Sequence, residues 1–133
     1  MNKCIAVALI QAAKRLEKRF EDALAEVDLS IAKYAALTAL VNGEACVSLS
    51  DLADRLTCVR SNVTQLVDRL EADGLAKRSH DPLDRRGVRA EATPLGVERQ
   101  AVGAQVMTKV QDEILRDLSE EERRSLQRLL ENI

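Results

Sequence analysis

Residues 48–93 carry the pattern that most constrains the fold, because their apolar spacing changes along the segment and helix or turn signals mark each change. Ser48-Leu-Ser-Asp51 has the spacing of a capping box, with Asp in place of the usual Glu, and opens a short amphipathic segment. After a turn at residues 57–59, apolar residues recur at helical spacing from Val63 to Leu70, and Gly74 is a residue type that commonly follows a helix end. The pattern predicts two helices joined by a short turn.

Residues 75–80 and 88–93 are two short alternating runs around a turn-rich basic segment, residues 81–87. Alternation with a period of two around turn residues is typical of a β-hairpin. A helix pair followed by a basic hairpin suits duplex DNA, because a helix fits the major groove while a charged loop reaches the backbone or the minor groove. Residues 30–93 are therefore expected to form a winged helix-turn-helix lobe.

Long amphipathic segments flank this lobe. Apolar residues recur every three or four positions from Ile5 to Val27, and again from Val102 to Ile114. Thr93-Pro94 is a helix cap followed by proline at the first helical position, and Ser119-Glu-Glu-Glu122 is a second capping box. The whole chain is thus predicted to be mainly α, with the small β-hairpin as a wing.

The chain has 133 residues, a length that fits one domain. Within it we expect residues 1–28 and 94–133 to form a helical dimerisation region, since long terminal helices around a small lobe would leave apolar area uncovered without a partner. A two-fold homodimer would read a pseudo-palindromic operator in double-stranded DNA, with half-sites about 10 bp apart.

The formal net charge is -2 at pH 7, but the charges are unevenly placed. Residues 55–89 contain eight Lys or Arg against five Asp or Glu, whereas residues 112–133 contain seven acids against four bases. Charge distribution matters more than the total for a protein that meets a polyanion. The middle of the chain is therefore expected to face an anionic partner.

Side chains that read base edges must donate and accept hydrogen bonds near the start of the recognition helix: Asn or Gln for adenine, Arg for guanine, Ser or Thr for phosphates or mixed edges. The candidates are Arg60, Ser61, Asn62, Thr64, Gln65 and Arg69. Most surface helices carry a solvated polar face, so these residues alone do not indicate base contact. The helix before them and the wing after them favour it.

Arg85 and Arg86 lie at the predicted turn of the wing, where a guanidinium can enter a narrow minor groove or clamp a phosphate. They could instead form surface ion pairs with Asp81 and Asp84, which contribute little. We expect one arginine to pair internally and the other to meet DNA. Further candidates for contact with the DNA backbone are Lys77, Arg78 and Arg89.

Together these motifs resemble the winged helix-turn-helix of the MarR family of bacterial regulators, and the resemblance covers nearly the whole chain. It rests on Leu52-Ala-Asp-Arg-Leu56, on the run from Ser61 to Leu75, on Asp81-Pro-Leu-Asp-Arg-Arg-Gly87 and on Thr93-Pro-Leu-Gly96. The resemblance implies a homodimer whose first and last two helices interlock, with two DNA-binding lobes below them.

By position in the family pattern, four side chains would face the major groove: Ser61, Asn62, Gln65 and Arg69. Arg85 or Arg86 would face the minor groove, and Asp68 would brace the wing by pairing with Arg86. Many relatives bind phenolic or aromatic acids between the dimer helices and the DNA lobe, so a small-molecule effector is a further expectation.

Three cysteines without CxxC spacing fit a reducing cytoplasm better than a disulfide framework. Cys4 lies beside Lys3 near the start of the first helix, a setting that favours a reactive thiol, and some family members sense oxidants through a cysteine in that region. The alternative is an inert thiol on a helix. Cys58 is expected in the core, and Cys46 is undecided.

The leading hypothesis is a dimeric regulator, acting as a repressor that a small-molecule or redox signal releases. The alternative is a winged-helix module used for protein contacts without DNA binding. An enzyme is not expected, because the chain has no His-paired nucleophile, Gly-rich phosphate loop or apolar carboxylate pair. The lone His80 argues against a metal site, and no cofactor is expected.

No apolar stretch is long enough for a membrane span. The apolar run in the first ten residues is short for a signal peptide and continues into a charged amphipathic pattern. A cytoplasmic location is therefore expected.

Overall fold

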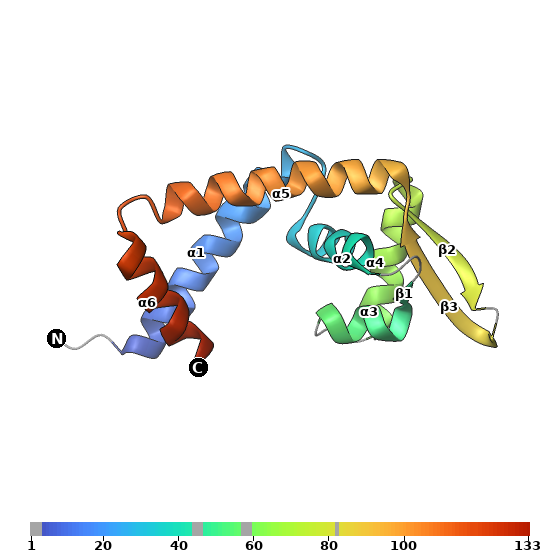
Figure 1. Cartoon of the computed structure of the whole chain (residues 1–133), viewed down its shortest axis with the longest axis horizontal. Helices are drawn as coiled ribbons and strands as arrows, with labels where there is room; N and C mark the ends of the chain where they lie inside the picture. Colours follow the sequence, from blue (N-terminus) through green and yellow to red (C-terminus); the bar gives the residue numbers. More distant parts are fainter. Residues whose placement is uncertain (1–3, 44–46, 57–59, 82) are drawn as a thin grey trace.

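The computed structural model describes residues 4–43, 47–56, 60–81 and 83–133. Its elements are α1 (Ile5–Ala25), α2 (Ile31–Asn42), β1 (Val47–Ser48), α3 (Leu49–Leu56), α4 (Arg60–Ala72), β2 (Ala76–Asp81), β3 (Asp84–Ala92), α5 (Pro94–Ile114) and α6 (Glu120–Glu131). Helix α5 joins two parts: α1 and α6 lie at one end, and α2 to α4 with the strands lie at the other (Figure 1). The expected fold class, mainly helical with a winged helix-turn-helix, is confirmed.

Local capping signals set the starts of several helices as the sequence predicts. The Ser30 hydroxyl accepts a hydrogen bond from the Lys33 amide, and the Thr93 hydroxyl accepts one from Gly96. At α6, Ser119 and Glu122 cap each other reciprocally, and the hydrogen bond from the Ser119 backbone amide lowers the pKa of the Glu122 carboxyl. These bonds satisfy amides that have no partner within a helix.

The core of the winged helix-turn-helix lobe, residues 30–93, is aliphatic. Fully buried side chains from α2, α3 and α4 meet there: Leu37, Leu52, Val63, Val67 and Leu70. The three strands form an antiparallel sheet in the order β1-β3-β2, which packs against these helices through Ala76 and Ala90. This packing places the hairpin directly beside α4.

The sheet differs from the sequence-based prediction in two ways. Strand pairing continues to Asp81 and Asp84, so the connecting turn is much shorter than the predicted loop over residues 81–87. Backbone pairing does not require apolar side chains, and the exposed end of the hairpin can therefore extend through polar residues. The short strand β1, which pairs Val47 with Ala90, was not predicted from the sequence.

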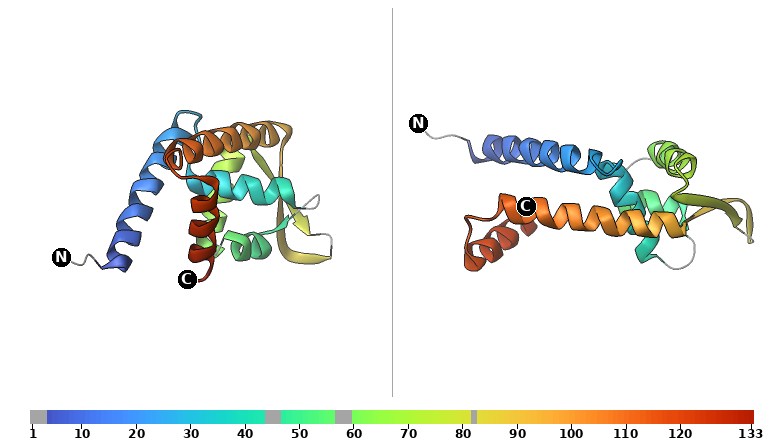
Figure 2. Two further views of the ribbon diagram at one scale, coloured as in Figure 1. Left: turned by 60° about the vertical axis from the view of Figure 1, so that its left-hand side comes forward. Right: turned by 90° about the horizontal axis from the view of Figure 1, so that it is seen from above.

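The C-terminal part of α1 packs against α5, where an ion pair at 3.3 Å joins Arg19 to Glu113, and the rest of α1 runs away from α5 (Figure 1 and Figure 2). Of the apolar stripe on α1, only Leu24 is buried, whereas Ile5 is 78% exposed. On α6 the leucines at 126, 129 and 130 are exposed as well. The terminal helices thus carry apolar faces that the other described residues do not cover.

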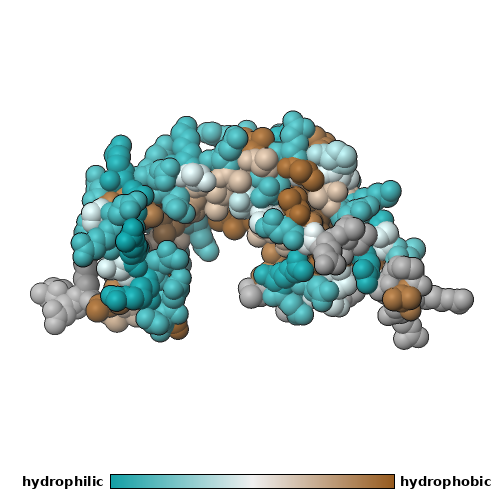
Figure 3. All heavy atoms as spheres, in the orientation of Figure 1, coloured by the Kyte–Doolittle hydropathy of each residue, from teal (hydrophilic) through white to brown (hydrophobic). Residues whose placement is uncertain are grey.

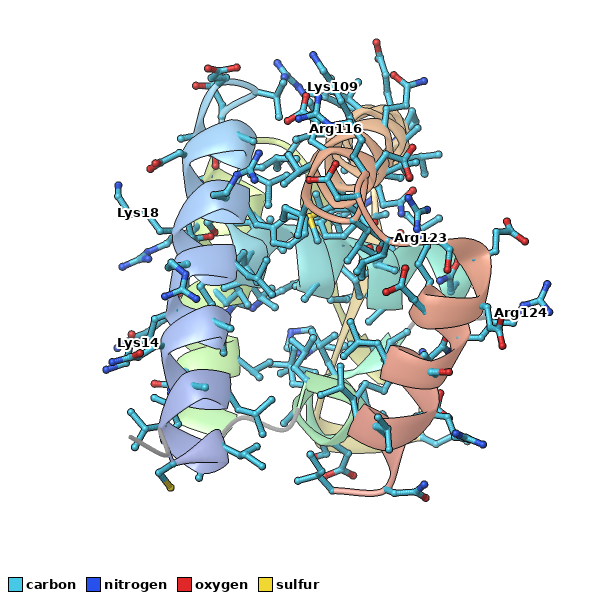
Figure 4. The ribbon with its side chains drawn as sticks, turned by 90° about the vertical axis from the view of Figure 1, so that its left-hand side faces the viewer. Lys14, Lys18, Lys109, Arg116, Arg123 and Arg124 are labelled. Atoms are coloured by element: carbon cyan, nitrogen blue, oxygen red, sulfur yellow. The ribbon has the colours of Figure 1, made fainter. Side chains whose placement is uncertain are left out.

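A groove of about 740 Å³ lies between α1 and the C-terminal helices. Its apolar lining is Leu16, Phe20, Ile114, Leu115, Leu126 and Leu130. Seen from this end, Lys14 and Lys18 point away from α6, and Arg124 points to the opposite side (Figure 4). Arg123 and Glu131 line the groove together with its apolar side chains. On the face shown in Figure 3, hydrophobic surface gathers along the inner side of α5 and where α5 meets α2.

Candidate nucleic-acid interface

Helix α4 presents an exposed polar face opposite its buried one. Asn62, Gln65 and Arg69 are exposed, as is Thr64, while Val63 and Val67 on the other side are fully buried. Positions three and four apart share one side of a helix, so Asn62, Gln65 and Arg69 lie on one face. These side chains can donate and accept hydrogen bonds in the pattern that base edges require.

Two of the predicted contact residues begin this helix, but their side chains fall outside the described part of the structure. They are Arg60 and Ser61, both in the first turn of α4. The same holds for Arg85 and Arg86, whose backbone belongs to β3. Contacts of these four residues with DNA stay predictions.

Arg78 on β2 joins the wing to the recognition helix. Its guanidinium donates to the Asp68 carboxylate, to the Thr64 carbonyl oxygen at 3.0 Å and to Glu71 at 3.5 Å. Its backbone amide also donates to Glu71, at 3.0 Å. Thr64, Asp68 and Glu71 occupy successive turns of α4, so one arginine holds about two turns of the helix against the hairpin.

The partner of Asp68 in the structure is therefore Arg78. The predicted pairing of Asp68 with Arg86 stays a prediction, because the Arg86 side chain lies outside the described residues. Arg78 was expected to contact the DNA backbone, yet its side chain is only 25% exposed and is engaged by α4. A sequence signal for this exists: Arg78 is two positions from the buried Ala76, and alternate strand residues share a face.

Lys77 occupies the other face of β2 and is exposed, so its predicted contact with phosphate needs no rearrangement of the wing. In register it lies opposite Glu91 on β3. Arg89 is half-buried and lies in register between Ser48 on β1 and Ser79 on β2. Lys77 is thus the better placed of these two cations.

Hydrogen bonds join α5 to α2 and to the segment before it, and an ion pair joins α2 to the segment after α4. The Arg99 guanidinium donates to the Val27 carbonyl oxygen at 3.2 Å, and Gln100 donates to the Thr38 hydroxyl at 3.3 Å. The Lys33 ammonium on α2 pairs at 2.9 Å with Asp73, just after the end of α4. These contacts connect α5 to the end of α4 through α2.

A cavity of about 420 Å³ lies between α1 and the helices of the lobe. Ile31 on α2, Leu56 on α3 and Leu66 on α4 line it, and Glu17 and Glu21 on α1 complete its lining. Because Leu66 lies on α4, an occupant of this cavity would touch both the lobe and α1.

The described residues contain no group of three or more His, Cys, Asp or Glu side chains that could hold a metal ion. Cys4 is exposed and free, whereas Cys46 and Cys58 lie outside the described ranges. Within those same ranges, no helix has the length and apolar character needed to cross a bilayer.

Comparison with known proteins points to one family. The model of the MarR family matches residues 29–88. The chain is 32% identical over 89 residues to the HTH-type transcriptional regulator PrsX of Escherichia coli, a match that covers 66% of this chain and 54% of PrsX. The chain spans about half the length of the curated relatives it matches, and these are named as transcriptional regulators, not as enzymes.

The structural similarity extends over nearly the whole chain. The transcriptional regulator BldR from Sulfolobus solfataricus is 30% identical, with a TM-score of 0.80, and the match covers 97% of this chain and 94% of BldR. A mutant MarR from Escherichia coli, crystallised with operator DNA, has the same fold with a TM-score of 0.87 at 22% identity, covering 96% of this chain and 91% of that one.

Proposed function

Because the chain belongs to the MarR family, we propose that it is a sequence-specific DNA-binding transcriptional regulator that works as a homodimer. The observation that carries this proposal is the exposed polar face of α4, which lies beside a wing that Arg78 holds in place. In this arrangement α4 enters the major groove while the wing lies along the backbone and the minor groove. The transcriptional regulator BldR and the operator complex of MarR have this fold.

The roles within the interface follow from side-chain chemistry. Asn62 and Gln65 suit adenine, and Arg69 suits guanine, because each can make two hydrogen bonds to its base. Ser61, Thr64 and Arg60 complete the major-groove set. Lys77 contacts phosphate, and Arg85 or Arg86 reaches the minor groove.

The partner in the proposed dimer is a second copy of the chain, held by residues 1–28 and 94–133. The apolar groove of about 740 Å³ and the exposed leucines of α6, two of which line it, support this arrangement, since the same surfaces of a second copy can cover them. Residues 30–93 of each copy would then contact one half-site of a pseudo-palindromic operator.

The regulator acts in the cytoplasm as a repressor that a signal releases. The cavity lined by Leu66 and Glu17 supports a small-molecule effector, because its occupant touches the recognition helix. The exposed Cys4 thiol supports oxidation as the alternative signal.

The function is tested by selecting duplexes from a random-sequence pool and measuring their affinity for the protein at several salt concentrations. We expect an enriched two-fold motif and a steep loss of affinity with salt, the slope of log affinity against log salt being about -0.9 for each phosphate contact. A slope near zero, or no enriched sequence, would instead support the protein-interaction module.

The dimer is tested separately with Leu126→Glu. The change removes an apolar side chain and adds a carboxylate that a partner covering the groove would desolvate, so we expect sedimentation equilibrium to show dissociation at concentrations where the wild type is dimeric. Arg124→Glu, which also adds a carboxylate to α6 but points away from the groove, is the control. An unchanged mass for Leu126→Glu would place the dimer contact elsewhere.

A further inference from the structure

We propose that Leu83, in the turn of the wing, contacts the floor of the DNA minor groove and selects A·T over G·C base pairs beneath the wing. The inference rests on the proposed DNA binding, and it goes beyond that proposal by assigning a specificity-determining role to an apolar side chain. Arginines are the expected minor-groove residues of the wing, so Leu83 has no part in the sequence-based interface.

The side chain of Leu83 is 93% exposed. Among the described residues, the other exposed large apolar side chains lie on α1, α5 and α6 or at Ile133, after the end of α6. Those positions belong to the terminal helices and suit the proposed dimer contact. Leu83 is the exception, because it is the one exposed large apolar side chain described in the DNA-binding lobe.

Burial among the described residues does not account for leucine at this position. Asp81 pairs with Asp84, so Leu83 lies in the short turn that joins β2 to β3. Turns of this kind favour Gly, Asn, Asp or Ser, whose backbone preferences suit them, whereas leucine contributes chiefly by burial. An exposed leucine alone has little meaning, but this one lies where the hairpin projects farthest from α4 and α5 (Figure 1).

The chemistry of the minor groove gives such a side chain a selective role. An A·T pair presents only acceptors on the groove floor, whereas a G·C pair adds the 2-amino donor of guanine. A leucine side chain cannot accept a hydrogen bond, so covering that amino group would leave a donor without water or a partner. Proteins that bind the minor groove frequently place apolar side chains such as leucine there.

The experiment changes only the minor-groove face of the DNA. In the duplex obtained by selection, adenines beneath the wing are replaced by 2,6-diaminopurine, which adds the 2-amino group and keeps the major-groove face of the A·T pair. We expect the wild type to lose affinity about fivefold or more. Leu83→Ser should lose less than about twofold, because the serine hydroxyl accepts from the added amino group.

Ala72→Ser is the matched control, since it replaces an exposed apolar side chain with serine at the end of α4, outside the wing, and should respond to diaminopurine as the wild type does. A wild type that tolerates diaminopurine, or a Leu83→Ser variant as sensitive as the wild type, would overturn the assignment. Failure of the proposed function looks different, because no protein would then select or bind any duplex with a salt-dependent affinity.

Discussion

Replacing Gly96 with alanine is expected to lower the free energy of unfolding by about 3 kcal/mol or more. Gly96 lies in the first turn of α5, where the backbone of Leu75 crosses it, and a Cβ atom would stand 2.0 Å from the Leu75 carbonyl oxygen. Backbone atoms cannot rotate away as a flexible side chain can. The start of α5 and the residue that precedes β2, Leu75, would therefore have to move apart.

This separation would break a connected set of hydrogen bonds. The Thr93 amide donates to the Leu75 carbonyl at 3.1 Å, and the Thr93 hydroxyl donates to the Gly74 carbonyl at 2.6 Å. The effect is opposite in sign to that of an ordinary glycine within a helix, where alanine stabilises by about 1 kcal/mol.

Urea denaturation of Gly96→Ala measures this loss of stability, with Glu98→Ala as the control. Glu98 is an exposed residue of the same helix, so its replacement should change the free energy of unfolding by less than about 0.5 kcal/mol. If Gly96→Ala were as stable as the wild type, the start of α5 could not pack as closely against the Leu75 backbone as the structure shows.

Arg78→Ala is expected to weaken operator binding by about tenfold or more, although Arg78 need not touch DNA. Without the guanidinium, the wing loses its attachment to Thr64, Asp68 and Glu71 on α4. Two carboxylates also remain unneutralised beside the DNA-facing side of the helix. Helix and wing could then no longer be held in the relative position that both grooves require.

Glu71→Ala separates this positioning role from a direct phosphate contact. If Arg78 bound phosphate, removal of a nearby negative charge would strengthen DNA binding. Because Glu71 holds both the side chain and the backbone amide of Arg78, we expect its replacement to weaken binding a few-fold instead. Titration of the selected duplex with each variant shows directly whether the DNA affinity rises or falls.

Asp54→Asn is the matched control, since it removes a negative charge from an exposed position on α3. We expect binding equal to or tighter than that of the wild type. Tighter binding by Glu71→Ala would return Arg78 to the set of phosphate contacts that the sequence suggested.

The helix starts were predictable because capping is local. Ser30, Thr93 and Ser119 each satisfy an amide three positions ahead, so a few neighbouring residues hold all the information needed. Strand β1 was not predictable in this way. Its two residues become a strand only by pairing with Arg89 and Ala90, which lie about 40 positions further along the chain.

The polar face of α4 was also predictable, since helical periodicity separates Gln65 from the buried Val63 and Val67. The partner of Asp68 was harder to predict, because several arginines follow it and sequence spacing does not rank them. The register of β2 against β3 turns Arg78 toward α4.

The sequence by itself determined where most helices begin, which faces are apolar and that a basic hairpin follows a helix pair, because caps, periodicity and turn residues act over a few positions. Only the tertiary structure decided that Arg78 holds the wing against α4 and that the Leu75 backbone packs directly against Gly96. It also decided that the Leu83 side chain is exposed at the turn of the wing. These features depend on distances between residues that are remote in the chain or on the burial of whole faces, which local patterns do not encode.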